Sequence, residues 1–406
     1  MKHWKTVLAA AGATMAATPA LAQEVRLTPL VDARLRYEQV DQDGIADQSD
    51  ALTVRLRSGV QASDGPFSLL VESEATLALD PHYNDGVNGK ALPLVADPQN
   101  VELNRAQLRY ADHGVAVTAG RQLLELADQR FVGSSSWRQN QQTFDAVRVQ
   151  WSGVPRLSVD VSYAWSVRTV NGIQGNAARP QSVPGDNVFA LASYAAPIGT
   201  VTGFAYLVDQ DLPALSGFRL SSQTYGVRFA GARSLGEKWK LAYVASFARQ
   251  SDYGDNPNRY AASYYFGEAT LTRHVVAATA GYEVLGADGG AALTSMQTPL
   301  ASFFRFNGWA GKFGTTPPDG LRDLYGTLAA NWSIKGKGLV HGLGLAATFH
   351  HFDADRLATH YGDEVDVMAS AKLAKTLLAL RFVRYRADHF ATNTNKLFVT
   401  LDWAFQ

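Results

Sequence analysis

The stretch ALTVRLRSGVQA, residues 51–62, alternates apolar side chains with charged or polar ones. In an extended strand, successive side chains point to opposite faces. One face would then carry Leu52, Val54, Leu56, Val60 and Ala62, and the other Thr53, Arg55, Arg57 and Gln61. A half-buried strand of a soluble protein alternates in the same way, so the rest of the chain has to decide which environment each face meets.

The same alternation recurs along the chain, for example in segments 31–38, 68–77, 157–165, 364–372 and 396–405. Short turn-like breaks such as SDGP at 63–66 and ADHG at 111–114 alternate with longer polar stretches such as 80–99 and 286–320. The segments between these breaks number about eighteen and hold about ten residues each, which is typical of transmembrane β-barrels. We therefore predict an all-β fold, a transmembrane antiparallel β-barrel with short turns at one end and long loops at the other.

A soluble all-β protein is the alternative fold. It would divide into sandwiches of seven to nine strands and would have irregular loops at both ends. The regular alternation of short and long connections favours the barrel. Aromatic residues near the predicted strand ends do so too, because such residues form girdles at the membrane interfaces. These residues are Trp151, Tyr163, Trp165, Trp239, Tyr282, Trp332, Trp403 and Phe405.

The environment of the barrel explains the opening stretch. A lipid-facing charge near the bilayer midplane costs about 2–4 kcal/mol, so the apolar face of residues 51–62 should meet lipid. Arg55 and Arg57 should then point into the lumen, as expected of a pore.

The first residues of the chain have the layout of a cleavable secretory signal. Lys2 and Lys5 precede an apolar segment that ends in Ala20-Leu21-Ala22, a pattern that signal peptidases recognise. We predict a signal peptide at residues 1–22 and a single barrel at residues 23–406. Together these predict the bacterial outer membrane as the location, with membrane lipid and lipopolysaccharide around the barrel.

Composition excludes several other classes of protein. No later apolar run approaches the roughly 18 residues of a membrane helix. The chain has no cysteine, which excludes disulfide scaffolds and cysteine-ligated metals. Its formal net charge is zero, so it lacks the basic surface of a nucleic-acid-binding protein.

Charged residues of the predicted strands fall on the inner face by the same alternation. The lumen-facing arginines are Arg34, Arg36, Arg55, Arg57, Arg105, Arg109, Arg148 and Arg228. A guanidinium matches two carboxylate oxygens at once, so these residues favour solutes such as uronic-acid polymers over neutral sugars. Alternatively, they pair with the acidic side chains of the same strands and brace the wall.

Two segments resemble a known family. In the segment 120–151 the matching positions are Gly120, Arg121, Gln122, Asp128, Arg130, Trp137, Phe144, Asp145 and Arg148. In the segment 298–329 they are Phe306, Gly308, Trp309, Thr315, Pro317, Gly320, Leu321 and Asp323. Both resemble the alginate-export family of bacterial outer-membrane proteins. This resemblance implies a monomeric barrel of eighteen strands and a positively charged conduit for an acidic polysaccharide.

Two loops should narrow the lumen. The loop 125–142 is long enough to fold inward, where Arg130 and Arg138 would meet Asp128 and the wall. We expect Arg121, Asp128, Arg130 and Arg138 to join the wall arginines as solute contacts, with a structural knot of Asp128, Arg130 and Asp145 that fixes the loop as the alternative. The loop 286–320 should be either a second internal constriction or an external lid.

Catalytic and metal chemistry are not expected. GSSSW at 133–137 lacks the form of a nucleophile elbow, and no histidine is near it in the sequence. Histidines and carboxylates gather around residues 350–364, but their irregular spacing predicts a solvated loop and not a metal site. We predict a passive channel for anionic oligo- or polysaccharides, with no enzymatic activity and no cofactor. The alternative function is a general porin for the uptake of small solutes.

Overall fold

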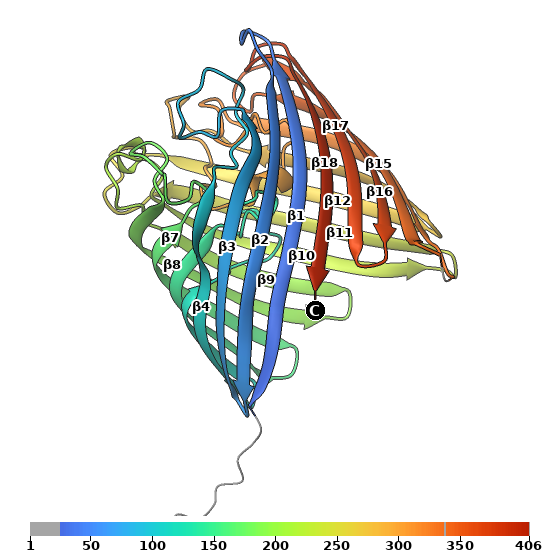
Figure 1. Ribbon diagram of the computed structural model, residues 1–406. Coiled ribbons are helices and arrows are strands. Elements are labelled where there is room, and N and C mark those ends of the chain that lie inside the picture. The colour runs from blue at the N-terminus through green and yellow to red at the C-terminus, as the bar shows by residue number, and fades with distance from the viewer. Residues whose placement is uncertain (1–24, 337, 406) are drawn as a thin grey trace, which may run out of the picture.

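The computed structural model describes residues 25–336 and 338–405; the predicted signal peptide lies outside this part of the chain. Within it, eighteen antiparallel strands form one sheet. β1 pairs with both β2 and β18, which closes the sheet into a barrel (Figure 1). The predicted fold class is confirmed.

The strands follow one another around the barrel in chain order. Their bounds are β1 Arg26–Gln42, β2 Ser49–Asp64, β3 Phe67–His82, β4 Asn100–Asp112, β5 Val115–Gln122, β6 Thr143–Val154, β7 Leu157–Arg168, β8 Ser182–Ala196, β9 Gly199–Val208, β10 Ser222–Leu235, β11 Trp239–Asp252, β12 Ala261–Arg273, β13 Val276–Leu285, β14 Leu321–Ser333, β15 Val340–Asp353, β16 His360–Leu373, β17 Thr376–Ala387 and β18 Thr394–Phe405. They hold 8 to 17 residues, so several exceed the predicted ten. Since about 9–11 residues suffice to cross a bilayer, the longer strands extend beyond it.

Helical structure in the described residues is limited to two 3-10 turns, Ser216–Phe218 and Phe303–Arg305, both in loops. None of the described helices has the length and apolar character needed to cross a membrane.

The connections differ strongly between the two ends of the barrel. Short turns at residues 65–66, 113–114, 155–156 and 197–198 lie at one end, as predicted. The long connections, which include residues 83–99, 123–142, 169–181, 209–221 and 286–320, gather at the other end (Figure 1). This arrangement follows from the antiparallel order of the strands, because every second connection lies at the same end of the barrel.

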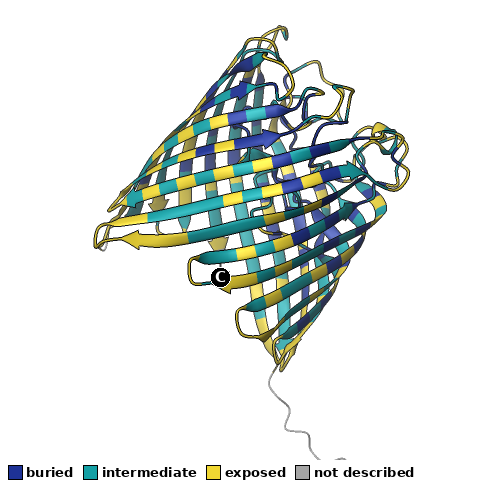
Figure 2. Cartoon of the chain, turned by 180° about the vertical axis from the view of Figure 1, so that it is seen from behind, coloured by how far each residue is buried: buried dark blue, intermediate teal, exposed yellow. Residues whose placement is uncertain are grey.

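The two faces of each strand differ in burial, as the banded pattern of Figure 2 shows. In β2, Leu56 and Val60 are 46% and 43% exposed on the outer surface, whereas Arg55 and Arg57 are 1% and 7% exposed. The apolar face therefore points to the lipid and the arginines point inward. This placement of the two faces of β2 is the one predicted from the alternation in residues 51–62.

The loops 123–142 and 286–320 both fold into the lumen. Val132 forms a parallel bridge with Leu300, and the Gly133 backbone N–H donates to the Leu300 carbonyl at 2.9 Å. Their buried side chains belong to the same apolar cluster as Phe189 and Phe352 of the wall. The loop end of the lumen is thus partly filled by a packed core, and loop 286–320 is an internal constriction.

Candidate functional site

Most of the predicted wall arginines are ion-paired with carboxylates of the described chain. The pairs are Arg34 with Asp402, Arg36 with Asp97, Arg55 with Asp32, Arg57 with Glu74, Arg105 with Glu72, Arg148 with Asp160 and Arg228 with Asp128. Arg109 instead donates to the neutral oxygens of Thr118 and Gln150, at 3.2 and 3.3 Å. The paired guanidiniums are neutralised locally, so they brace the wall.

Several wall residues also hold loop 123–142 in place. Arg36 donates to the Trp137 carbonyl at 2.5 Å, and Arg57 donates to the Gln139 carbonyl at 3.2 Å. Gln139 in turn donates from Nε2 to Thr53 Oγ1 at 2.8 Å. Because these contacts reach the loop backbone, they fix its path across the lumen.

Asp128 and Arg130 join the loop to the wall, as in the predicted knot, but Asp145 takes no part because it pairs with Arg121. Asp128 pairs with Arg228 of β10 at 2.6 Å. Arg130 is 2% exposed and bonds from Nε to Glu283 of β13 at 2.7 Å and from Nη2 to Asn307 at 3.0 Å. These partners enclose Arg130, which argues against a contact between its guanidinium and a solute.

Arg121 is also placed differently from its predicted role. It forms a bidentate pair with Asp145, at 2.7 and 2.9 Å. Arg121 shares a face of β5 with the exposed Ala119, whereas Thr118 and Gln122 are buried on the inner face. The strand alternation thus puts Arg121 outside the lumen, and its matching position in the family motif reflects a strand-joining pair.

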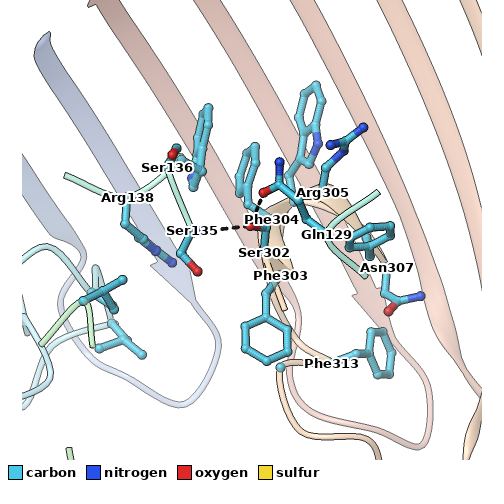
Figure 3. Close-up of a pocket in the computed structure, with 18 of the residues that line it drawn as sticks. Gln129, Ser135, Ser136, Arg138, Ser302, Phe303, Phe304, Arg305, Asn307 and Phe313 are labelled. Atoms are coloured by element: carbon cyan, nitrogen blue, oxygen red, sulfur yellow. Dashed lines mark hydrogen bonds between the residues drawn. The ribbon is translucent and has the colours of Figure 1, made fainter. Parts of the chain in front are cut away.

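A cavity of about 840 Å³ lies between the two inward loops and the wall, and residues of the loops 83–99 and 169–181 also line it. The loops meet beside it through Ser302, whose hydroxyl donates to Gln129 Oε1 at 2.7 Å and accepts from the Ser135 backbone N–H at 3.0 Å (Figure 3). Arg138 and Arg305 come from different loops and both line this cavity. The two loops therefore build the site jointly.

A row of aromatic rings forms one side of the cavity. The ring of Trp137 stacks on that of Phe304 at 3.4 Å, and Phe304 stacks on Trp309 at 5.6 Å. Guanidinium groups lie over the ring of Trp137, that of Arg36 at 4.2 Å and that of Arg381 at 4.7 Å from its centroid. Such contacts orient a cation without neutralising it.

Four cavity arginines are not neutralised by a close ion pair. Among the described residues, Arg179, Arg305 and Arg381 have no carboxylate oxygen within ion-pair distance, and Arg138 has only Glu38 at 3.8 Å. Burial, with a further contribution from Arg138, lowers the pKa of Arg179, but an arginine remains charged at neutral pH. These guanidiniums make the cavity a place where an anion is favoured.

Of the cavity arginines, only Arg34 and Arg138 are among the residues that the sequence predicts. Arg381 could have been found, because it alternates with the outward-facing Leu380 and Phe382. Arg305 stands in the family-like segment 298–329 but outside its matching positions. Arg179 follows no strand pattern, and its place depends on how a loop folds.

The chain was compared with known proteins. The alginate export family matches residues 26–283, more than half of the chain, and no curated protein sequence matches significantly. OccAB3 of Acinetobacter baumannii has a similar structure, with a TM-score of 0.68 and 14% identity over 93% of this chain and 99% of that one. The outer membrane protein OpdK of Pseudomonas aeruginosa, crystallised with vanillate, has a TM-score of 0.65 and 13% identity over 93% and 98%. The protein is thus a member of the alginate export family and forms a channel in the bacterial outer membrane.

Proposed function

We propose that the protein is a passive channel for anionic oligo- or polysaccharides, which it selects in the cavity between its two inward loops. The observation that carries this proposal is the set of cavity guanidiniums with few carboxylate partners among the described residues: Arg179, Arg305 and Arg381 have none within ion-pair distance, and Arg138 has only Glu38 at 3.8 Å. A uronic acid offers a carboxylate to such groups. Conduction requires contacts that are weak enough to exchange, as half-buried arginines in water provide.

The aromatic row supports a saccharide in particular. The side chains of Trp137, Phe304 and Trp309 line the same cavity as the guanidiniums. A sugar ring has an apolar face that packs on an aromatic ring, while its carboxylate and hydroxyl groups point outward. A cavity that holds both aromatic rings and guanidinium groups therefore suits an acidic sugar better than a simple inorganic anion.

A second candidate is the uptake of small solutes, with aromatic carboxylates the best fit. The observation favouring it is the narrowing of the lumen by both loops, which leaves a cavity of about 840 Å³. OpdK, which shares this fold, was crystallised with vanillate. A small planar acid would also use an aromatic face and a guanidinium together.

Single-channel recording in a planar bilayer tests the proposal. We expect anion preference in a salt gradient and a concentration-dependent block by oligouronates. R305A and R381A should each weaken the block several-fold. R249A is the matched control, because exposed Arg249 bonds to Ser263 on the outer surface and its loss changes net charge equally.

Three other results of these recordings would contradict the proposal or change it. A channel that prefers cations, or one that oligouronates do not block, contradicts the proposal. Block by a small aromatic carboxylate without block by oligouronates would instead establish the second candidate. An equal loss of block in R249A would show that overall charge, and not the cavity, determines selectivity.

A further inference from the structure

A group of histidines and aspartates lies at the loop end of β15 and β16, away from the cavity. His351 and Asp353 lie on β15, and His360 and Asp363 lie on β16. Their neighbour His350 is buried on the inner face, whereas Phe349 is 50% exposed on the outer face. Since residues alternate along a strand, His351 and Asp353 belong to the outer face of the barrel.

The two imidazoles are parallel and flanked by carboxylates. The rings of His351 and His360 stack with centroids 4.3 Å apart. Asp353 lies on one side, 3.4 Å from His351 Nε2 and 3.0 Å from His360 Nδ1. Asp363 lies on the other side, 2.7 Å from His351 Nδ1 and 3.5 Å from His360 Nε2. Both nitrogens of each ring therefore face an acidic group.

The distances on the Asp353 side match the edges of a metal coordination shell. Metal–ligand bonds of about 2.0–2.1 Å in a tetrahedron place the ligand atoms roughly 3.3 Å apart. The donor atoms of His351, Asp353 and His360 all lie within 4.8 Å of one another. His351 Nε2 is 3.4 Å from Asp353 Oδ2 and His360 Nδ1 is 3.0 Å from Asp353 Oδ1, and both separations are close to that edge. These side chains are 28% to 42% exposed, so an ion from solution can reach them.

Asp363 has the position of a supporting group. Its oxygen is at hydrogen-bond distance, 2.7 Å, from the His351 nitrogen that faces away from Asp353. A metal-bound histidine usually donates its other N–H to a carboxylate, which fixes the ring and raises its basicity. Asp363 would supply this second hydrogen bond without binding the ion itself.

We propose that His351, Asp353 and His360 bind a divalent transition-metal ion at the outer rim of the barrel, with Asp363 orienting the imidazoles. Two nitrogens and one carboxylate suit Zn²⁺, Ni²⁺ or Cu²⁺. Mg²⁺ and Ca²⁺ prefer shells made of oxygen. A bound ion would join β15 to β16 across the connecting loop 354–359 and would leave a coordination position open to the outside.

Calorimetric titration of the tag-free protein in detergent tests this site, with ZnCl₂ as the probe. We expect saturable binding of one ion per chain and no comparable binding of MgCl₂ or CaCl₂. H351A and H360A should each weaken zinc binding about 100-fold or more, and D363N about 10–100-fold. His82 faces Asp47 at 3.7 Å and belongs to no group of three donors in the described chain, so H82A should bind zinc like the unaltered protein.

Crystals soaked in zinc give an independent reading. An anomalous peak between the three donor side chains would support the site directly. Absence of saturable binding at millimolar zinc would overturn the proposal, and so would unchanged affinity in the H351A/H360A double variant. Since none of the four side chains of this site lines the cavity, failure of the metal site would leave the proposed transport function unaffected.

Discussion

Arginine serves two purposes in the lumen, and the partner of each side chain decides which. Arg57 and Glu74 are 7% and 1% exposed and form a close ion pair. A buried charge is tolerated only where it is paired and hydrogen-bonded. Arg305 is exposed beside the cavity and has no such partner in the described chain. We therefore expect stability to depend on the first kind of arginine, and the proposed attraction of anions to depend on the second.

R57A should destabilise the barrel by about 3–5 kcal/mol, because it leaves Glu74 buried without its ion-pair partner. Denaturant unfolding of the protein in lipid would measure this change. R109A is the matched control, since Arg109 bonds to neutral Thr118 and Gln150 and its loss should cost less than about 1.5 kcal/mol. Equal effects of the two variants would argue against the bracing role of the ion pairs.

At the scale of elements, the two inward loops define the passage together. Arg130 of one loop bonds to Glu283 of the wall and to Asn307 of the other loop. Asn307 in turn donates to Glu283 Oε2 at 2.7 Å. One guanidinium thus holds three segments of the chain, and its loss should loosen both loops at once.

R130A should increase the frequency of steps between conductance levels in single-channel recordings, because the loops then sample more than one position. R121A serves as its control: Arg121 belongs to the same family-like segment but pairs with Asp145 outside the lumen. We expect R121A to conduct like the unaltered channel. Steady currents in R130A, equal to those in R121A, would contradict the role assigned to Arg130.

The elements were more predictable than the site. Strand alternation located the faces of β2, and the spacing of breaks placed both short turns and long loops, because those features are local in the sequence. The positions of Arg179 and Arg305 depend on how the loops 169–181 and 286–320 fold. These loops pack through contacts between residues far apart in the chain. Arg121 was misassigned because a family motif reports that a residue matters and not which face it occupies.

At the scale of the whole molecule, net charge gives no basis for the anion preference that we propose. The chain has 37 basic and 37 acidic residues and a formal charge of zero. Selectivity has to come from how these charges are distributed, because the field in a narrow lumen is set by the nearest unneutralised groups. A lysine of the loop 286–320 has a lowered pKa, and its titration allows the local field to be changed without substitution.

Lys312 lies in loop 286–320, next to the cavity-lining Gly311 and Phe313. Burial and the neighbouring Lys396 lower the pKa of Lys312 to about 8. An amine is charged below its pKa, so raising the pH from about 7 to about 9 removes one positive charge. The anion preference, measured as a reversal potential, should therefore fall with a midpoint near pH 8.

Two variants separate this titration from other effects of pH. K312R should keep its anion preference up to about pH 9, because a guanidinium does not titrate in this range. K312M should show, already at about pH 7, the weaker preference that the unaltered channel reaches only in alkali. The same fall of anion preference in K312R would show that another group titrates. A constant preference in the unaltered channel would show that the charge of Lys312 does not affect the permeating anions.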